Sequence, residues 1–192
     1  VISGTMFPTM GGAAAMNIHG KNNFKVGTFG DNLLEIDLLL GNGDLVTCSR
    51  EQNAELFHGA IGGFGMLGII TRAKTRTTKV YSGDVRVRWI SCHDLGEMMD
   101  AMQELVGEAD YLVGWIDTFG SGSAGGRGLI HDARYLLDGE DSDPDKTLSL
   151  KHQDLPDAVM GVPKAEIWRV LRMFNHDPGM RLVNAIKQVS GR

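Results

Sequence analysis

The stretch Thr9–Asn23 constrains the fold of this chain most, because it gathers small residues, helix formers and polar side chains in one short segment. Gly11 and Gly12 lack a Cβ and can adopt backbone angles that other residues avoid, so successive N–H groups can point at one anion. We expect Ala13–Met16 to form a short helical turn whose free amides favour a phosphate by roughly 0.3–2 kcal/mol. The stretch predicts a backbone that a large anionic ligand approaches closely.

Three polar side chains follow the expected turn. His19, Lys21 and Asn22 offer an imidazole, a fixed cation and an amide beside the bound anion. A glycine pair by itself is more often a tight turn, and a nearby lysine is more often solvated. Both interpretations stay open on this stretch alone.

A second glycine-rich turn lies at Gly62–Gly68, and residues 63–68 spell Gly-x-Gly-x-x-Gly. A dinucleotide-binding crossover has this motif after a strand and before a helix, whereas here an expected helix precedes it and an expected strand follows. We therefore reject an NAD-type site. Gly63, Gly65 and Gly68 either let a ligand approach the backbone or simply let the helix and the strand pack closely.

The remaining patterns predict an α+β fold without internal repeats. Leu33–Leu40 and Leu45–Cys48 read as a hairpin joined by the turn Gly41–Asp44. Ser49–Gln52 matches a capping box, which predicts a helix at about 50–59, before a strand at 68–80. After a boundary near 81–84, we expect strands at 85–90, 111–117 and 128–135 and a helix at 93–108. We predict that the apolar stripe of this last helix, Leu95, Met98, Met99, Met102, Leu105 and Val106, is core.

The C-terminal part is less regular. Asp138–Asp145 is acidic and turn-rich, which predicts a mobile loop, and it lacks the spacing of a calcium loop. Pro163–Phe174 and Met180–Val189 have helical spacing of apolar residues. Trp115, Asp117, His131 and Arg134 lie on the expected strands, where they face either a substrate pocket or solvent.

Charge and composition exclude several classes of partner. The chain of 192 residues has a formal net charge of −5, which favours neither nucleic acid nor an anionic membrane surface. The sequence has no membrane-spanning stretch and no visible signal peptide. Cys48 and Cys92 read as reduced, partly buried thiols, and we expect a cytoplasmic protein that binds no metal. The sequence leaves the oligomeric state open.

Three ordered motifs carry a family resemblance: Gly4-Thr5, Thr9-x-Gly-Gly-Ala and Ile18-His-Gly-Lys-Asn22. They resemble the second half of the FAD-binding domain of the vanillyl-alcohol-oxidase type, also called the p-cresol-methylhydroxylase (PCMH) type, and within it the decaprenylphosphoryl ribose oxidase branch. The resemblance implies that residues 1–80 are the C-terminal part of the FAD-binding domain. It implies that residues 81–192 are part of an α+β cap domain for the substrate. Val1–Thr5 would then be the end of a strand whose sheet partners lie outside this sequence.

The resemblance also implies chemistry. It predicts an FAD-dependent oxidoreductase that moves a hydride between flavin and a small-molecule substrate, namely a sugar, polyol or similar alcohol. A sterol-type reductase on the same scaffold and a binding domain without flavin chemistry are the alternatives. Lys21 matches a lysine near the substrate and is the predicted catalytic residue. Asn17, Asn23 and Phe64 depart from the family pattern.

The predicted FAD is noncovalent, because the matched branch does not attach flavin through the position of His19. We expect this chain alone to hold no FAD, because the cofactor would lie between two subdomains. The predicted cofactor-binding residues are Gly4, Thr5, Thr9, Met10, Gly11, Gly12, His19, Gly20, Lys21, Asn22, Gly63, Gly65, Gly68 and Ile70.

Overall fold

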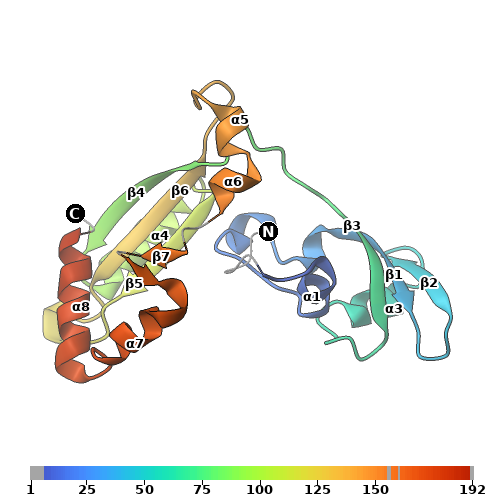
Figure 1. Cartoon of the computed structure of the whole chain (residues 1–192), viewed down its shortest axis with the longest axis horizontal. Helices are drawn as coiled ribbons and strands as arrows, with labels where there is room; N and C mark the ends of the chain where they lie inside the picture. Colours follow the sequence, from blue (N-terminus) through green and yellow to red (C-terminus); the bar gives the residue numbers. More distant parts are fainter. Residues whose placement is uncertain (1–6, 155–156, 160, 191–192) are drawn as a thin grey trace. The chain divides into compact units, whose positions relative to one another are not determined.

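The computed structural model describes residues 7–154, 157–159 and 161–190. The chain divides into two compact units, residues 1–79 and residues 80–192, here called the first and second units. Both units combine helices with antiparallel sheet, so the chain has an α+β fold (Figure 1). The expected strand at Val1–Thr5 lies outside the described residues, as do Gly4 and Thr5.

The first unit is built on a three-stranded sheet of order β2-β1-β3. β1 (Leu33–Leu39) pairs antiparallel with β2 (Leu45–Ser49) and with β3 (Ile69–Thr75). The predicted hairpin is confirmed. Its turn closes through the Leu40 amide, which donates to the Asp44 carbonyl at 2.8 Å, and Gly43 takes a φ of 91° that suits glycine.

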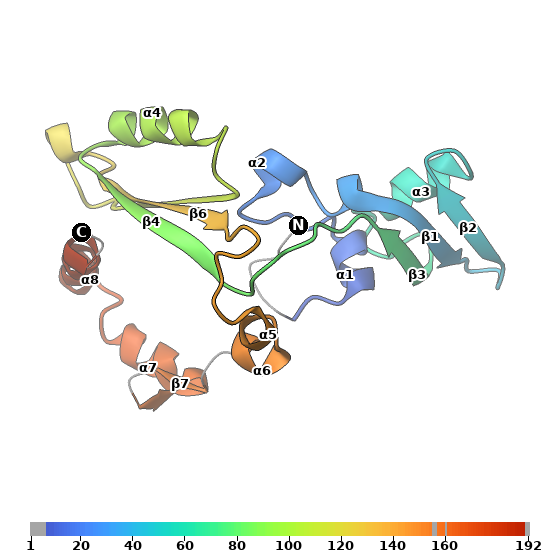
Figure 2. The same cartoon turned by 90° about the horizontal axis from the view of Figure 1, so that it is seen from above.

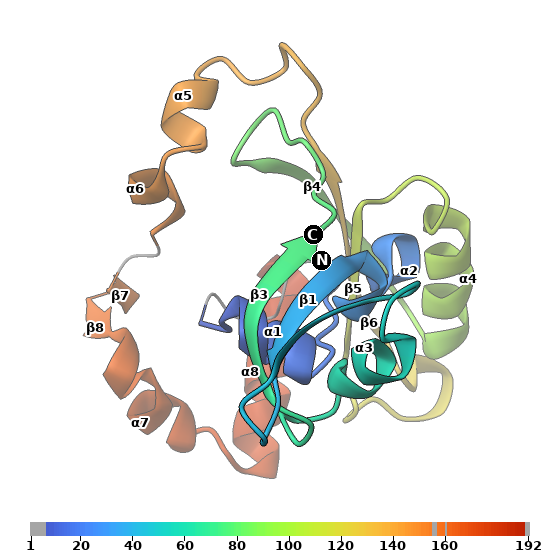
Figure 3. The same cartoon turned by 90° about the vertical axis from the view of Figure 1, so that its right-hand side faces the viewer.

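Two helices cover one face of this sheet. α1 (Met10–Ala15) contacts β3 (Figure 3), and α3 (Ala54–Ala60) contacts β2 (Figure 1). The buried core between helices and sheet consists of Ala14, Leu33, Ile36, Leu38, Cys48, Phe57 and Ala60. Burial raises the pKa of the Cys48 thiol, which agrees with an inert cysteine.

The predicted capping box at Ser49–Gln52 is wrong, because α3 begins only at Ala54. The Ser49 hydroxyl accepts hydrogen bonds from the amides of Glu51 and Gln52, each at 3.1 Å, and so closes a local turn. Asn53 then adopts a left-handed φ of 51° before the helix. The serine side chain stabilises a turn that competes with the first helical turn.

The second unit contains a sheet of order β4-β6-β5, formed by β4 (Val85–Cys92), β5 (Tyr111–Ile116) and β6 (Gly128–Tyr135). α4 (Leu95–Leu105) lies over one face of this sheet (Figure 2). Cys92, Met98, Leu105 and Ile130 form the buried cluster between them.

The predicted apolar stripe of α4 is only partly core. Met98 and Leu105 are buried and Met102 packs against them, whereas Met99 is 61% exposed and Leu95 is 46% exposed. Met98, Met102 and Leu105 follow one line of the helix at i, i+4 and i+7, and the exposed residues flank that line. The stripe is wider than the face that the sheet covers.

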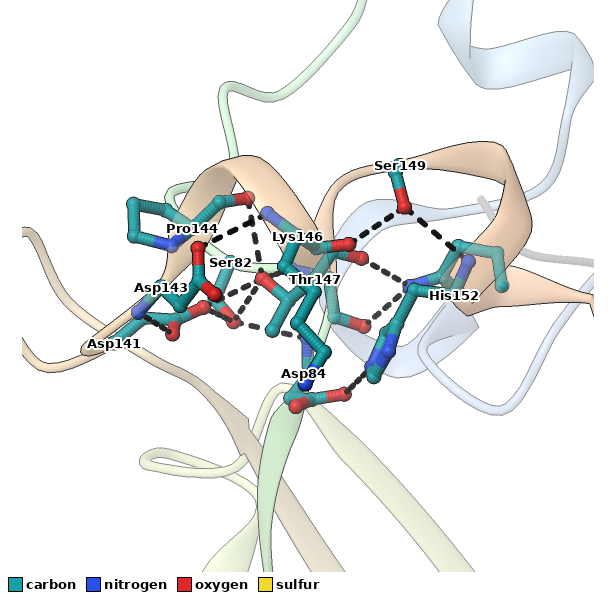
Figure 4. A network of polar contacts seen from close by, with 11 residues as sticks. Ser82, Asp84, Asp141, Asp143, Pro144, Lys146, Thr147, Ser149 and His152 are labelled. Atoms are coloured by element: carbon teal, nitrogen blue, oxygen red, sulfur yellow. Dashed lines mark hydrogen bonds and ion pairs between the residues drawn. The ribbon is translucent and has the colours of Figure 1, made fainter.

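The acidic segment 138–145 also differs from its prediction. Its second half enters α5 (Pro144–Thr147), which is followed by α6 (Leu150–Gln153). The Asp141 carboxylate accepts hydrogen bonds from Ser82 Oγ at 2.5 Å, Thr147 Oγ1 at 2.6 Å and the Asp143 amide at 2.9 Å (Figure 4). These bonds join α5 to the residues that precede β4.

The other described elements are short, apart from the last helix. They are α2 (Asn23–Val26), η1 (Gly30–Asn32), η2 (Gly122–Ala124), β7 (Ala158–Val159), β8 (Val162–Pro163), η3 (Lys164–Glu166), α7 (Ile167–Arg172) and α8 (Asp177–Ser190).

The helix predicted from Pro163 begins later than expected. Pro163 belongs to β8, and the 3-10 turn η3 precedes α7.

Candidate functional site

The first glycine pair lies inside a helix and not in a loop. α1 begins at Met10, and the Thr9 hydroxyl accepts a hydrogen bond from the Gly12 amide at 3.1 Å. Gly11 and Gly12 are absent from the glycines with positive φ among the described residues. The expectation of unusual backbone angles at these two positions is therefore wrong. Threonine at the cap position starts the helix three residues before the predicted Ala13.

The turn between α3 and β3 does use unusual backbone angles. Gly62, Gly65 and Gly68 have φ values of 72°, 74° and 156°, and Phe64 has a φ of 54° although it is not a glycine. A Cβ on Gly63 would lie 2.1 Å from the Gly59 carbonyl oxygen, and one on Gly68 would lie 2.4 Å from the Leu39 carbonyl oxygen. Close packing therefore explains Gly63 and Gly68, whereas Gly65 has open space around it.

The two glycine-rich segments meet at the C-terminal end of α1. The Gly62 amide donates to the Ala14 carbonyl at 3.0 Å, and the Phe64 amide donates to the Ala15 carbonyl at 2.9 Å. The bond from Phe64 satisfies a carbonyl group that the end of the helix leaves open, whereas the Ala14 carbonyl also accepts from the Asn17 amide. The segments at residues 11 and 63 thus belong to one local structure, formed by residues 48 or more apart in the sequence.

The chain leaving α1 forms a closed loop that carries the predicted polar residues. The Phe29 amide donates to the Ile18 carbonyl at 2.8 Å, and the Gly30 amide donates to Asn17 Oδ1 at 2.8 Å. These two bonds form the neck of the loop 18–29, hereafter the neck. Asn17 was noted in the sequence only as a departure from a family pattern, and nothing there indicated its bond to Gly30.

The loop 18–29 brings His19, Gly20, Lys21 and Asn22 together at one end of the first unit. His19 and Lys21 are exposed, whereas Asn22 is 3% exposed. The buried Oδ1 of Asn22 has no hydrogen-bond partner among the described residues. A buried acceptor without a donor costs free energy, so this oxygen is suited to receive a hydrogen bond from a ligand.

The far side of the loop is stiffened by side chains of the segment that follows it, Asp31 and Asn32. Asn32 Nδ2 donates to the carbonyls of Val26 and Thr28 at 2.8 and 2.9 Å. The amide and hydroxyl of Thr28 donate to the Asp31 carboxylate and hold its pKa below the usual range. The loop therefore has a defined shape through bonds that the polar motif itself does not supply.

The second glycine turn borders a shallow hollow. A cavity of about 210 Å³ lies between the turn and the end of β1, and its lining includes Gly65 and Gly68. Ile70, a predicted cofactor-binding residue, packs against the hydrophobic core, while the neighbouring Ile69 is 66% exposed. Alternation along β3 turns these two side chains to opposite faces.

In the second unit, Asp117 is a structural residue. Its carboxylate is 2% exposed and accepts hydrogen bonds from the Phe119 amide, from Arg127 Nε and from Asn184 Nδ2. Burial alone would raise the pKa of Asp117, but these donors together hold it below its ordinary value. Asn184 lies on α8, so this bond fastens α8 to the segment after β5.

Arg134 and His131 also have local roles. Arg134 pairs with Asp132 at 3.3 Å and with Glu108 at 2.8 Å, and the His131 ring lies 3.9 Å from the Trp89 ring, centroid to centroid. Trp115 has the Lys187 amine 5.2 Å above its ring. These contacts do not decide whether the three side chains face a substrate pocket or solvent.

Metal and membrane chemistry find no support in the described ranges. Residues 7–154, 157–159 and 161–190 contain no group of three or more His, Cys, Asp or Glu side chains placed to hold a metal ion. Within the same ranges, every helix is too short or too polar to span a bilayer.

Comparison with known proteins identifies the first segment. Residues 2–49 match the family model described as FAD binding domain. Cytokinin dehydrogenase 2 of Arabidopsis thaliana is 46% identical over 66 residues, which cover 34% of this chain and 13% of that protein. Cytokinin dehydrogenase 5 of the same plant is 39% identical over 85 residues, covering 44% of this chain and 15% of that protein.

A longer match reaches into the second unit. Cytokinin dehydrogenase 5 of Oryza sativa subsp. japonica is 34% identical over 129 residues, which cover 63% of this chain and 22% of that protein. The chain spans less than a quarter of the length of each of these relatives. The matched FAD domain includes α1 and the loop 18–29. The first unit therefore carries a segment of an FAD-binding domain, and FAD is the cofactor that this type of domain holds.

Proposed function

We propose that the protein is an FAD-dependent oxidoreductase of the PCMH type. The observation that carries this proposal is the FAD binding domain match over residues 2–49, which contains the predicted site residues from Gly4 to Asn22. The structure adds that this region and the turn 62–68 are joined by hydrogen bonds.

The residues of the loop suit the cofactor chemically. FAD presents an anionic diphosphate together with hydroxyl and ring N–H donors. Lys21 supplies an exposed cation for the flavin end of the cofactor, and Asn22 Oδ1, which has no partner among the described residues, supplies a buried acceptor for one of those donors. The open space at Gly65 lets a ligand reach the backbone there. We propose that these groups, with Thr9, Met10, Gly11, Gly12, His19 and Gly20, hold FAD without a covalent bond.

The flavin, when bound, supplies the hydride chemistry, and the chain supplies binding and charge. In the proposed mechanism the Lys21 ammonium lies beside the substrate oxygen. There it would stabilise the negative charge on the substrate oxygen once the hydroxyl proton has passed to solvent water. The neck holds the backbone on either side of Lys21 while this charge develops.

We propose a sugar, polyol or similar alcohol as the substrate, because Lys21 matches the lysine of the decaprenylphosphoryl ribose oxidase branch. The second candidate is a cytokinin, favoured by the names of the relatives. The matched stretches cover 13% and 22% of those two relatives, so they support the cofactor more strongly than the substrate.

The proposal is tested by flavin content and by reduction of the flavin under anaerobic conditions. Full-length protein is purified, its visible absorption is recorded, and polyols, aldoses and a cytokinin are added in turn. We expect bound flavin that a polyol bleaches. Protein that neither contains nor takes up FAD would refute FAD as the cofactor. Bleaching by the cytokinin alone would show that the substrate is a cytokinin and not a polyol.

Replacing Lys21 by Ala tests its role. We expect Lys21→Ala to keep its flavin and to lower the rate of flavin reduction by roughly 10²–10³-fold, the effect of removing one donor to a developing anion. Lys25→Ala, which removes an exposed cation from α2, is the matched control. Equal rates in both variants would remove Lys21 from the mechanism.

A further inference from the structure

Asn17 lies where three segments of the first unit meet. Its backbone amide donates to the Ala14 carbonyl at 3.0 Å, at the end of α1. Its Oδ1 accepts from the Gly30 amide at 2.8 Å, and its Cβ lies 3.4 Å from the place that a Cβ on Gly62 would occupy. It therefore contacts α1, the far end of the loop 18–29 and the second glycine turn.

This position is specific to a small polar residue. Asn17 has a φ of 44°, in the left-handed region, where asparagine is tolerated better than most side chains. Gly30 is buried, and a Cβ there would lie 2.8 Å from Asn17 Oδ1 and 2.4 Å from Ile61 Cγ2. The close approach of the Gly30 backbone leaves no room for a bridging group, so the bond from Gly30 to Asn17 is direct.

Among the described residues, the structure gives two hydrogen bonds across the neck, and Asn17 accepts one of them. The other joins the next residue, Ile18, to Phe29. Lys21 and Asn22 follow within five positions. Backbone motion at Asn17 would therefore also move Lys21 and Asn22. We propose that Asn17 is a positioning residue, which holds Lys21 and Asn22 in the orientation in which they meet the flavin.

This inference rests on the proposed function, and it adds a residue outside the family motif. Pre-organisation of a loop improves affinity by removing part of the cost of ordering it on binding. Loss of a single hydrogen bond of this kind corresponds to a weakening of FAD binding by roughly five- to tenfold. The same loss changes the environment of the flavin ring, which its visible absorption reports.

The test compares two substitutions at Asn17 in full-length protein stripped of cofactor and titrated with FAD. Asn17→Gly tolerates the left-handed backbone but lacks Oδ1, whereas Asn17→Asp keeps an acceptor oxygen. We expect Asn17→Gly to bind FAD roughly five- to tenfold more weakly, with a shifted flavin absorption band. We expect Asn17→Asp to restore both the affinity and the band.

Asn53→Gly is the matched control. Asn53 is also a left-handed asparagine, with a φ of 51°, and its Nδ2 donates to the Thr47 carbonyl at 2.9 Å. Its loss should affect stability without altering FAD affinity or the absorption band. Equal FAD affinities in Asn17→Gly and wild type, equal losses in Asn17→Gly and Asn53→Gly, or failure of Asn17→Asp to rescue would overturn the inference. Failure of the wild type to bind FAD would instead refute the proposed function.

Discussion

Phe64 has a strained backbone at an exposed position of the first unit. It has a φ of 54°, and its ring is 70% exposed. A left-handed backbone costs a residue with a Cβ roughly 1–2 kcal/mol, which glycine avoids. We expect Phe64→Gly to relieve this strain with little loss of packing.

Met66→Gly is the control for this prediction, because Met66 is 85% exposed in the same turn and has no positive φ. Both variants gain the same freedom in the unfolded chain. The free energy of unfolding of Phe64→Gly should therefore exceed that of Met66→Gly by about 1–2 kcal/mol, measured by urea denaturation. Equal values would show that Phe64 is not strained.

For single residues, the sequence predicts where a turn lies better than it predicts which distant residues a side chain contacts. Gly62–Gly68 was correctly expected to form a turn between helix and strand, because its glycines interrupt two periodic segments. The role of Asn17 was not predictable, since its partners Gly30 and Gly62 lie 13 and 45 positions away in the sequence. Local pattern carries no information about such partners.

Among the elements, α5 is held by the bonds of Asp141, and α6 is joined to the same segment through His152 and Asp84 (Figure 4). Ser82 is 5% exposed and Thr147 is 7% exposed, so loss of either hydroxyl leaves Asp141 short of a donor in a buried place. We expect Ser82→Ala to lower the local stability of residues 144–153 by about 1–3 kcal/mol, measured as faster hydrogen exchange there. Ser142→Ala, which changes an exposed serine beside the network, should leave this exchange as in wild type. If Ser82→Ala left the hydrogen exchange of residues 144–153 unchanged, the bond between Ser82 and Asp141 would not stabilise these helices.

α8 should be released by acid, because Asp117 holds it through Asn184. The pKa of Asp117 is lower in the folded protein than its usual value of 3.8. Its ionised form therefore stabilises the fold fully above that usual value, and the stabilisation is lost as the pH falls through the lower folded pKa. Trp115 contacts Lys187 of α8, so its fluorescence reports the release.

We expect a fluorescence change on acidification that is weakened in Asp117→Asn, since an amide has no charge to lose. Gln188, which donates to Ser91 Oγ at 2.9 Å, provides a second contact of α8 that does not titrate. A transition of the same size in Asp117→Asn would assign the change to another group.

The sequence predicted the sheets well and the helix ends poorly. Hairpin residues such as Gly41–Asp44 determine a turn locally, and the alternation of apolar and basic residues at the start of β4 is visible in the sequence. The start of α3 was wrong because Ser49 bonds to a turn instead of a helix, and the exposed part of the α4 stripe depends on how much of that helix the sheet covers. A competing local turn decided where α3 begins, and packing against the sheet decided which residues of α4 are buried.

For the whole molecule, the central claim is that the first unit binds FAD through two segments distant in sequence. The family match covers residues 2–49, so it includes the loop 18–29 but not the turn 62–68. The structure joins the two by the bonds from Gly62 and Phe64 to the end of α1. The second unit has its own core and its own sheet, and its substrate role remains a proposal based on resemblance.

The most direct test is hydrogen exchange of the full-length protein with and without FAD, followed by mass spectrometry. The account predicts slower exchange on FAD binding both in residues 10–22 and in residues 62–68, with α4 unchanged. Slower exchange in only one of the two segments, or in neither while FAD is bound, would contradict it.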